Sequence, residues 1–149
     1  MVKWVYKGIV VDSIEKVPEG AIGFIYKISN TTNGRYYFGR KSIVGRRKKK
    51  LTLKEKLIPE NKRKTWKVEV KEVSGWKTYK GSNKPLLADI GKGDKYTKEI
   101  VCWCYSKAEL TYYETVHIVC SGCMITDDCY NDWFSAKVFK AHLKNKKLA

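Results

Sequence analysis

The sequence is poor in acidic residues and has no long hydrophobic run. Its 149 residues include 15 Asp and Glu against 31 Lys and Arg, which gives a formal net charge of +16. A deficit of negative charge this large favours a polyanionic partner, with nucleic acid as the first candidate and a membrane surface as the alternative. Because no stretch could span a bilayer and the start lacks a signal-peptide pattern, we expect a soluble cytoplasmic protein that does not enter a membrane.

The sequence also lacks an even number of cysteines. Five cysteines argue against a closed disulfide framework and fit a reducing compartment. Four or five thiolates could hold zinc, but C-x-C with a single C-x-x-C matches the usual ligand spacings poorly. The alternative is that Cys102 and Cys104 are core residues that share one face of a buried strand with Ile100. The remaining cysteines are Cys120, Cys123 and Cys129.

The 43% hydrophobic content fits a single globular domain over residues 1–149. Asn33-Gly34, between two apolar runs, is a strong signal for a β-hairpin. We expect strands near 3–11, 22–29, 35–40 and 97–105. We expect helices from Ser82 to Gly91, from Ser106 onward, and over about 133–147, where the chain is basic.

Residues 41–80 carry most of the excess positive charge. The run "GRRKKKLTLKEKLIPENKRK" within them predicts a partly helical basic insertion. Such a run either contacts a polyanion or is merely a solvated face.

The helix that begins at Ser106 has the clearest pattern. Ser106 and Glu109 have the spacing of a capping box. The apolar positions then recur at helical spacing: Leu110, Tyr113, His117 and Ile118. Glu114 falls inside this stripe, so its carboxylate is expected either in a buried ion pair or at a functional site.

Strand parity places Tyr26 and Tyr37 on the same face of the hairpin, whether its loop has two or four residues. Gly39 shares this face and is expected to leave room beside Tyr26 for a ligand. Tyr36 has the opposite parity. Two phenols beside a glycine gap indicate a site, and an aromatic ladder over the core is the alternative interpretation.

The ordered set of motifs resembles the GIY-YIG nuclease family. Four features carry the resemblance: Phe24-Ile25-Tyr26, Tyr37-Phe38-Gly39, the helical Glu114, and Tyr130-Asn131. The segment "WKTYKGS" is similar to an insertion of phage-type members, among them homing endonucleases. Phe24 and Phe38 depart from the family pattern, but both are apolar strand positions. The resemblance implies an α/β (α+β) fold, with a small antiparallel β-sheet flanked by helices and a basic insertion.

The resemblance also implies hydrolysis of DNA phosphodiester bonds with Mg²⁺ or Mn²⁺. Glu114 would bind the metal, and Asn131 would position the metal–phosphate assembly or another catalytic side chain. Tyr26 would orient or deprotonate the attacking water, with Tyr37 in support. The family's catalytic arginine matches Arg46 or Arg47, in a cluster where the register is ambiguous.

We therefore expect a metal-dependent DNA endonuclease of the phage or homing type, acting in the host cytoplasm if phage-encoded. The alternative is a basic nucleic-acid-binding protein that keeps the fold without catalysis. The insertion and the basic end "KVFKAHLKNKK" would supply most phosphate contacts, and Arg40 and Lys41 rival Arg46 and Arg47 for a contact in the site. The expected nucleic-acid-binding residues are Arg40, Lys41, Lys48, Lys49, Lys50 and Lys80.

Overall fold

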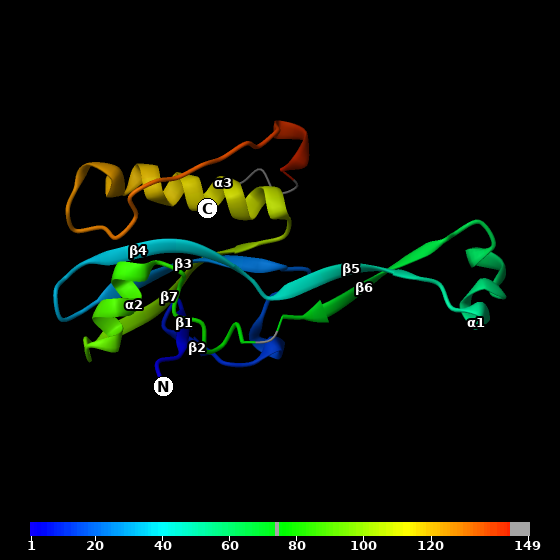
Figure 1. Ribbon diagram of the computed structural model, residues 1–149, viewed down its shortest axis with the longest axis horizontal. Coiled ribbons are helices and arrows are strands. Elements are labelled where there is room, and N and C mark those ends of the chain that lie inside the picture. The colour runs from blue at the N-terminus through cyan, green and yellow to red at the C-terminus, as the bar shows by residue number, and fades with distance from the viewer. Residues whose placement is uncertain (74, 144–149) are drawn as a thin grey trace.

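The computed structural model describes residues 1–73 and 75–143 (Figure 1). The strands are β1 (Trp4–Tyr6), β2 (Ile9–Val11), β3 (Gly23–Asn30), β4 (Tyr36–Ser42), β5 (Val44–Lys50), β6 (Trp66–Glu72) and β7 (Tyr96–Cys104). The α-helices are α1 (Leu53–Lys56), α2 (Lys84–Gly91) and α3 (Lys107–Cys120). Short 3₁₀ turns occupy Ile14–Lys16, Pro59–Asn61, Cys123–Ile125 and Lys140–His142. Within the described residues, no helix is long and apolar enough to cross a membrane.

Five strands form the central sheet in the order β2-β1-β7-β3-β4. The expected α+β fold is confirmed, although the sheet is mixed because β1 runs parallel to β7. The single strand expected over 3–11 is a hairpin, since Lys7 and Gly8 both adopt positive φ angles (47° and 82°) and reverse the chain. Helix α3 covers one face of the sheet and α2 lies on the opposite side (Figure 1).

The two cores differ in composition. On the α2 side, Trp4, Phe24, Tyr26 and Trp76 form an aromatic core together with Leu86 of α2. The α3 side is packed by smaller residues: Ile25, Cys102, Cys104, Leu110 and Tyr113.

A bulge in β7 decides which side chains lie under Tyr26. The register between β3 and β7 shifts at Val101, so Tyr26 pairs with Ile100 and packs in the same core. Cys102 and Cys104 face α3 instead. The common face expected for Ile100, Cys102 and Cys104 is therefore wrong, because strict alternation fails across an inserted residue.

The first residues of α2 and α3 are each capped by a side chain. Ser106 Oγ accepts a hydrogen bond from the Glu109 N–H at 3.1 Å, as expected, but Glu109 Oε2 accepts from the Tyr105 N–H at 2.6 Å instead of completing the box on Ser106. The cap of α2 is Asn83 instead of Ser82.

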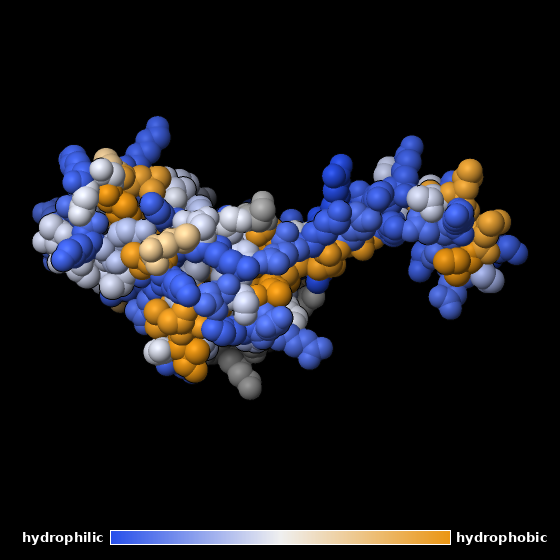
Figure 2. Space-filling model, turned by 90° about the horizontal axis from the view of Figure 1, so that it is seen from below, coloured by the Kyte–Doolittle hydropathy of each residue, from blue (hydrophilic) through white to orange (hydrophobic). Residues whose placement is uncertain are grey.

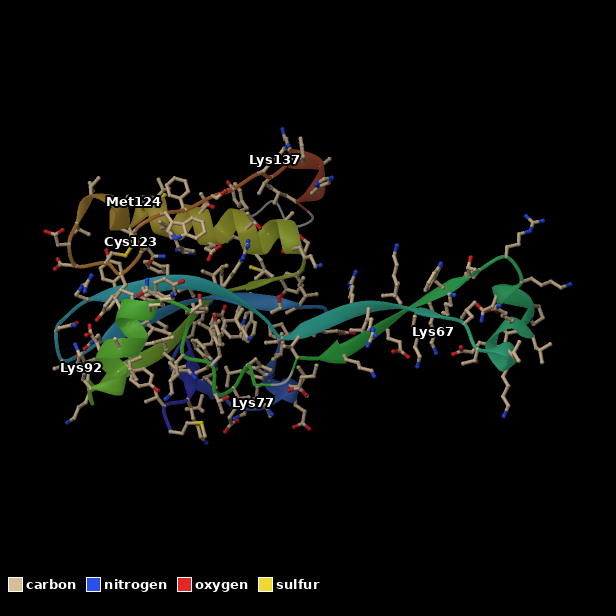
Figure 3. The ribbon with its side chains drawn as sticks, in the orientation of Figure 1. Lys67, Lys77, Lys92, Cys123, Met124 and Lys137 are labelled. Atoms are coloured by element: carbon tan, nitrogen blue, oxygen red, sulfur yellow. A yellow bond between two sulfur atoms is a disulfide. The ribbon has the colours of Figure 1, made fainter. Side chains whose placement is uncertain are left out.

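The five cysteines are divided between one disulfide and three free thiols. Cys123, at the end of α3 (Figure 3), forms a disulfide with Cys129, while Cys102, Cys104 and Cys120 are free. The odd number of cysteines therefore did not reveal that one pair forms a disulfide. In residues 1–73 and 75–143, no three His, Cys, Asp or Glu side chains form a metal-binding group, so the structure gives the zinc alternative no support.

The basic insertion is a projecting two-stranded ribbon of β5 and β6, separate from the central sheet (Figure 1). Within the ribbon, α-helix occurs in the short α1 at its tip. The basic run Arg46–Lys50 is instead a strand paired with Trp66–Val70. Hydrogen bonds from the Ile43 and Val44 N–H groups to the Ile22 carbonyl anchor its base at 2.9 and 3.1 Å.

The basic C-terminal helix expected over 133–147 is absent from 133–143, and its last residues lie outside the described part of the chain. Residues 133–139 are extended along α3 (Figure 1), and a single 3₁₀ turn follows. Ala136 and Val138, two residues apart, line a shared cavity with Val116 and Val119 of α3. An extended chain places such alternate residues on one face, which a helix does not.

The glycine gap at Gly39 is filled by the protein itself. A Cβ built on Gly39 would lie 2.5 Å from Tyr26 Cζ and 3.0 Å from Tyr37 Cε1. The expected ligand space is therefore occupied by the phenol of Tyr26, which is only 1% exposed.

We predict that Gly39→Ala lowers the free energy of unfolding by about 1–3 kcal/mol, the usual cost of overpacking, because the phenol of Tyr26 must move. Gly45→Ala is the matched control, since its Cβ would meet Val73 Cγ2 at an ordinary 3.6 Å. Urea or thermal unfolding measures both variants. Equal stabilities would mean that Tyr26 does not depend on the missing side chain.

Candidate active site

The segment after α3 covers one part of the edge strand β4. The Tyr36 N–H donates to the Asp128 carbonyl at 2.9 Å, and the Tyr130 N–H donates to the Tyr36 carbonyl at 2.8 Å. The side chain of Asn131 then makes the two hydrogen bonds that a neighbouring strand would make with Phe38. Its Oδ1 accepts from the Phe38 N–H and its Nδ2 donates to the Phe38 carbonyl, both at 2.8 Å.

A cleft of about 280 Å³ opens where this cover ends. Outward-facing amides recur every second residue of an antiparallel edge strand, so the amide after that of Phe38 belongs to Arg40. The cleft is lined by residues from β4, α3, the loop before α2 and the C-terminal segment, among them Arg40, Ser82, Glu114, Asn131, Trp133 and Phe134.

Glu114 projects from α3 into the cleft and is half-buried, with 22% of its side chain exposed. Arg40 Nε lies 3.4 Å from Glu114 Oε2, and Arg40 Nη1 also donates to Thr111 Oγ1, one turn earlier on the helix. Burial raises the pKa of Glu114, and the Arg40 guanidinium partly opposes this rise. The carboxylate is therefore held by a single cation at the wall of a solvent-accessible cleft.

The two motif tyrosines lie on the other side of β4, as strand parity predicts. Tyr26 pairs with Gly39 and Tyr37 with Ile28, and their ring centroids are 6.1 Å apart. Burial is the main cause of the raised pKa of Tyr26, and Tyr79, Tyr37 and Glu114 raise it further. Burial also raises the pKa of Tyr37, while a hydrogen bond with Ser82 opposes it.

The negative charge of Glu114 thus reaches both phenols, although α3 and the phenols lie on opposite faces of the sheet. This is possible because β4 is the outermost strand, and groups from both faces meet around its open edge. Arg40, Glu114 and Asn131 line the cleft together, whereas Tyr26 and Tyr37 are not among its lining residues, and Tyr37 connects to it through a hydrogen bond with Ser82.

A family model described as "Putative endonuclease segE, GIY-YIG domain" matches residues 4–138. The chain belongs to the GIY-YIG nuclease family. Comparison with curated proteins found no match, and comparison with solved structures found none either. The family match covers both tyrosine motifs, the ribbon and α3, so this GIY-YIG domain carries the ribbon as part of its fold.

The remaining basic candidates lie outside the cleft of this GIY-YIG domain. Arg46 and Arg47 are on β5 of the ribbon, with Lys48, Lys49 and Lys50 beyond them. Lys41 places its Nζ 4.2 Å from the ring centroid of Tyr79, and Lys80 is exposed beside it in the chain. The arginine that meets Glu114 is Arg40, whereas Arg46 and Arg47 lie on the ribbon.

Several residues in or beside the cleft were not predicted as site residues. Ser82, which lines the cleft, and Tyr79, whose ring packs against Tyr26, lie in the "WKTYKGS" segment, whose resemblance to phage-type members was the available signal. Trp133 and Phe134 line the cleft from an irregular segment, where neither periodicity nor spacing distinguishes them.

The donor set fits a hard divalent cation that is shared with a substrate. Mg²⁺ is often held by one or two carboxylates, with waters and substrate phosphate completing the shell. Glu114 supplies one carboxylate, and the cleft beside it provides space for the other ligands.

We predict that Arg40→Gln raises the pKa of Glu114 further, because the burial remains while the opposing cation is lost. An NMR titration of the Glu114 carboxyl in metal-free protein measures this shift. Lys41→Gln removes the same charge from the neighbouring residue, whose ammonium lies over Tyr79, and should leave the pKa almost unchanged. Equal effects of the two variants would contradict the assigned ion pair.

Proposed function

We propose that the protein is a metal-dependent endonuclease that hydrolyses DNA phosphodiester bonds, as a phage-type or homing-type enzyme. The observation that carries this proposal is the half-buried Glu114, which is paired with Arg40 in a cleft also lined by Ser82, the hydrogen-bond partner of the motif residue Tyr37. A protein that only binds DNA gains nothing from a carboxylate near the phosphates. A metal-dependent nuclease requires one.

Glu114 would hold Mg²⁺ or Mn²⁺ through its carboxylate. The bound cation would offset charge on the scissile phosphate and on the leaving oxygen. Thr111 and Glu114 contact the same guanidinium, so α3 and Arg40 together fix the direction of the carboxylate.

Arg40 would offset the charge that develops on the non-bridging phosphate oxygens. Its guanidinium has donors to spare beyond Thr111 and Glu114, and a planar fork suits phosphate. In the free protein the same group lowers the energy of the ionised Glu114. Arg40 would therefore stabilise the ionised carboxylate in the free protein and bind the phosphate when the substrate arrives.

The tyrosines differ in access, which separates their roles. Tyr26 is 1% exposed beneath Gly39, so it has little space to meet a substrate. Tyr37 is less buried and shares hydrogen bonds with Ser82 and Tyr26. We assign Tyr37 to orient the attacking water and Tyr26 to position the Tyr37 hydroxyl. Because both phenols have a raised pKa, they retain their protons in the free enzyme and act through hydrogen bonds.

Asn131 would support the site indirectly, through the backbone of β4. Both ends of its amide are bonded to the backbone of Phe38, so it fixes where the covered edge stops and the cleft begins. Lys41, over the ring of Tyr79, and the exposed Lys80 would contact phosphates that flank the cut, while the ribbon would supply further contacts.

We predict that Glu114→Gln abolishes nicking of supercoiled plasmid in Mg²⁺ while duplex affinity is kept or increases, since the variant loses a metal ligand and a negative charge. Glu99→Gln, which makes the same change at an exposed position of β7, should cleave normally. The parent protein should be inactive in EDTA. An active Glu114→Gln protein would exclude the metal assignment, and a parent inactive in both Mg²⁺ and Mn²⁺ would favour a binding protein.

We also predict that Tyr37→Phe and Tyr26→Phe each slow single-turnover nicking by about tenfold to a thousandfold, in the range for loss of one polar catalytic contact. Tyr36→Phe is the control, because Tyr36 faces the α3 side and packs on Phe38. Melting temperatures should change little in all three. If Tyr36→Phe and Tyr37→Phe slow nicking equally, the hydroxyl of Tyr37 has no special role.

A further inference from the structure

The strand register divides the side chains of the ribbon between two faces. Residues directly opposite each other in an antiparallel pair share a face. One face, the basic–apolar face, consists of Arg46, Lys48 and Lys50 opposite Val70, Val68 and Trp66. The other, the paired face, consists of Arg47, Lys49, Lys67, Glu69 and Lys71. Lys67 of the paired face is labelled in Figure 3.

The paired face balances part of its own charge. Glu69 lies 3.4 Å from Lys49, 3.7 Å from Lys67 and 3.9 Å from Lys71, and Lys67 also pairs with Glu55 at the tip. A two-stranded hairpin alone is marginally stable, so this ionic cluster helps to hold the two strands together. These lysines are engaged within the protein.

The basic–apolar face has no such balance. Among the described residues, the ion pairs include none from Arg46, Lys48 or Lys50. The acidic residue of the same parity is Glu72, opposite Val44 at the base of the ribbon, and it is engaged by Trp76 Nε1 at 2.8 Å and Lys77 Nζ at 3.8 Å. Its apolar members are open to solvent: Trp66 is 51% exposed, Val68 58% and Val70 59%. Figure 2 shows hydrophobic residues in a row along the ribbon, beside hydrophilic ones.

Exposed apolar side chains in a continuous row indicate a surface that a partner covers. A second copy of this chain is a poor occupant, because face-to-face contact would oppose three cations with three cations. Duplex DNA offers phosphates to the cations and thymine methyl groups to the valines. The charge of the face therefore selects DNA.

We propose that the basic–apolar face docks in the major groove of the DNA substrate, with Arg46, Lys48 and Lys50 on the phosphates and Val68 and Val70 against thymine methyls. This inference rests on the proposed function, since it assumes that DNA is the substrate. The major groove, about 12 Å wide, admits a two-stranded ribbon. Seven residues of strand span about 23 Å, roughly two thirds of a helical turn.

The ribbon is continuous with the site strand, because only Ile43 separates β4 from β5. The extended chain from Arg40 to Lys50 spans at most about 36 Å, close to one turn of DNA. Docking of the ribbon thus fixes the cut at less than about one turn from the bases that it contacts.

Two matched triple variants test the charged part of the proposal. The first replaces Arg46, Lys48 and Lys50 with alanine, and the second replaces Arg47, Lys49 and Lys71. Both lose three positive charges from the ribbon. Fluorescence anisotropy with a duplex in EDTA, over a range of salt, measures affinity without cleavage. The first triple should flatten the log–log salt slope by about 2.7, or 0.9 per phosphate contact, and the second by less than half of that.

Replacement of thymine by deoxyuridine tests the groove contact directly, because it removes only the 5-methyl group. The parent protein should bind the deoxyuridine duplex several-fold more weakly. The variant Val68→Thr/Val70→Thr, which keeps the side-chain shape and strand propensity, should bind both duplexes alike. Far-UV circular dichroism of each variant checks that the fold is kept.

Three outcomes would overturn the proposal: equal salt slopes for the two triples, equal affinity of the parent for both duplexes, or a dimer in sedimentation that Val68→Thr/Val70→Thr dissociates without loss of DNA affinity. Nicking is measured separately in Mg²⁺. Correct binding results with no nicking would leave the docking face standing and reject the proposed enzyme.

Discussion

An edge strand exposes a row of backbone N–H and C=O groups that must be paired, covered or used. In this domain one part of the edge of β4 is covered by the chain after α3, and the other part lines the cleft. The chain after α3 pairs with Tyr36, and the amide of Asn131 completes both hydrogen bonds of Phe38. Arg40 follows at the open part of the edge and meets Glu114 there. The position of the cleft thus depends on where one asparagine ends the cover, and the edge that could have promoted aggregation becomes the place where groups from both faces of the sheet converge.

The close fit of Tyr26 against Gly39 couples these two faces. Without a side chain at position 39, the phenol of Tyr26 reaches the backbone of the edge strand and supports Tyr37 beside it. Glu114 lies on the α3 side, yet its charge raises the pKa of both phenols, so the carboxylate and the tyrosines form one electrostatic unit. The bulge at Val101 brings Ile100 beneath the same phenol. Burial of a carboxylate and two phenols together costs stability, and the aromatic core around Trp4 and Phe24 offsets that cost.

The sequence predicted those features that depend on local pattern and strand parity. The hairpin, the common face of Tyr26 and Tyr37, the helix capped by Ser106 and the outlying Glu114 all follow from short-range spacing. Features set by pairing between distant segments could not be predicted. The run Arg46–Lys50 is a strand only because Trp66–Val70 lies opposite, and the bulge at Val101 is visible only in the register with β3. The pairing of Arg40 with Glu114 likewise joins residues that are far apart in the chain.

The distribution of charge explains how a domain of net charge +16 can keep the cleft beside Glu114 from being dominated by lysine. The densest run of cations, Arg46–Lys50, lies on the ribbon, and Lys49, Lys67 and Lys71 are near Glu69 there. A dense group of lysines around Glu114 would pair with the carboxylate and compete with a metal for it. A single arginine avoids this, because its planar group can contact the carboxylate and still present donors to a phosphate. In the proposed enzyme, DNA affinity and chemistry would therefore reside on different parts of one continuous segment, which begins at β4 and continues into β5.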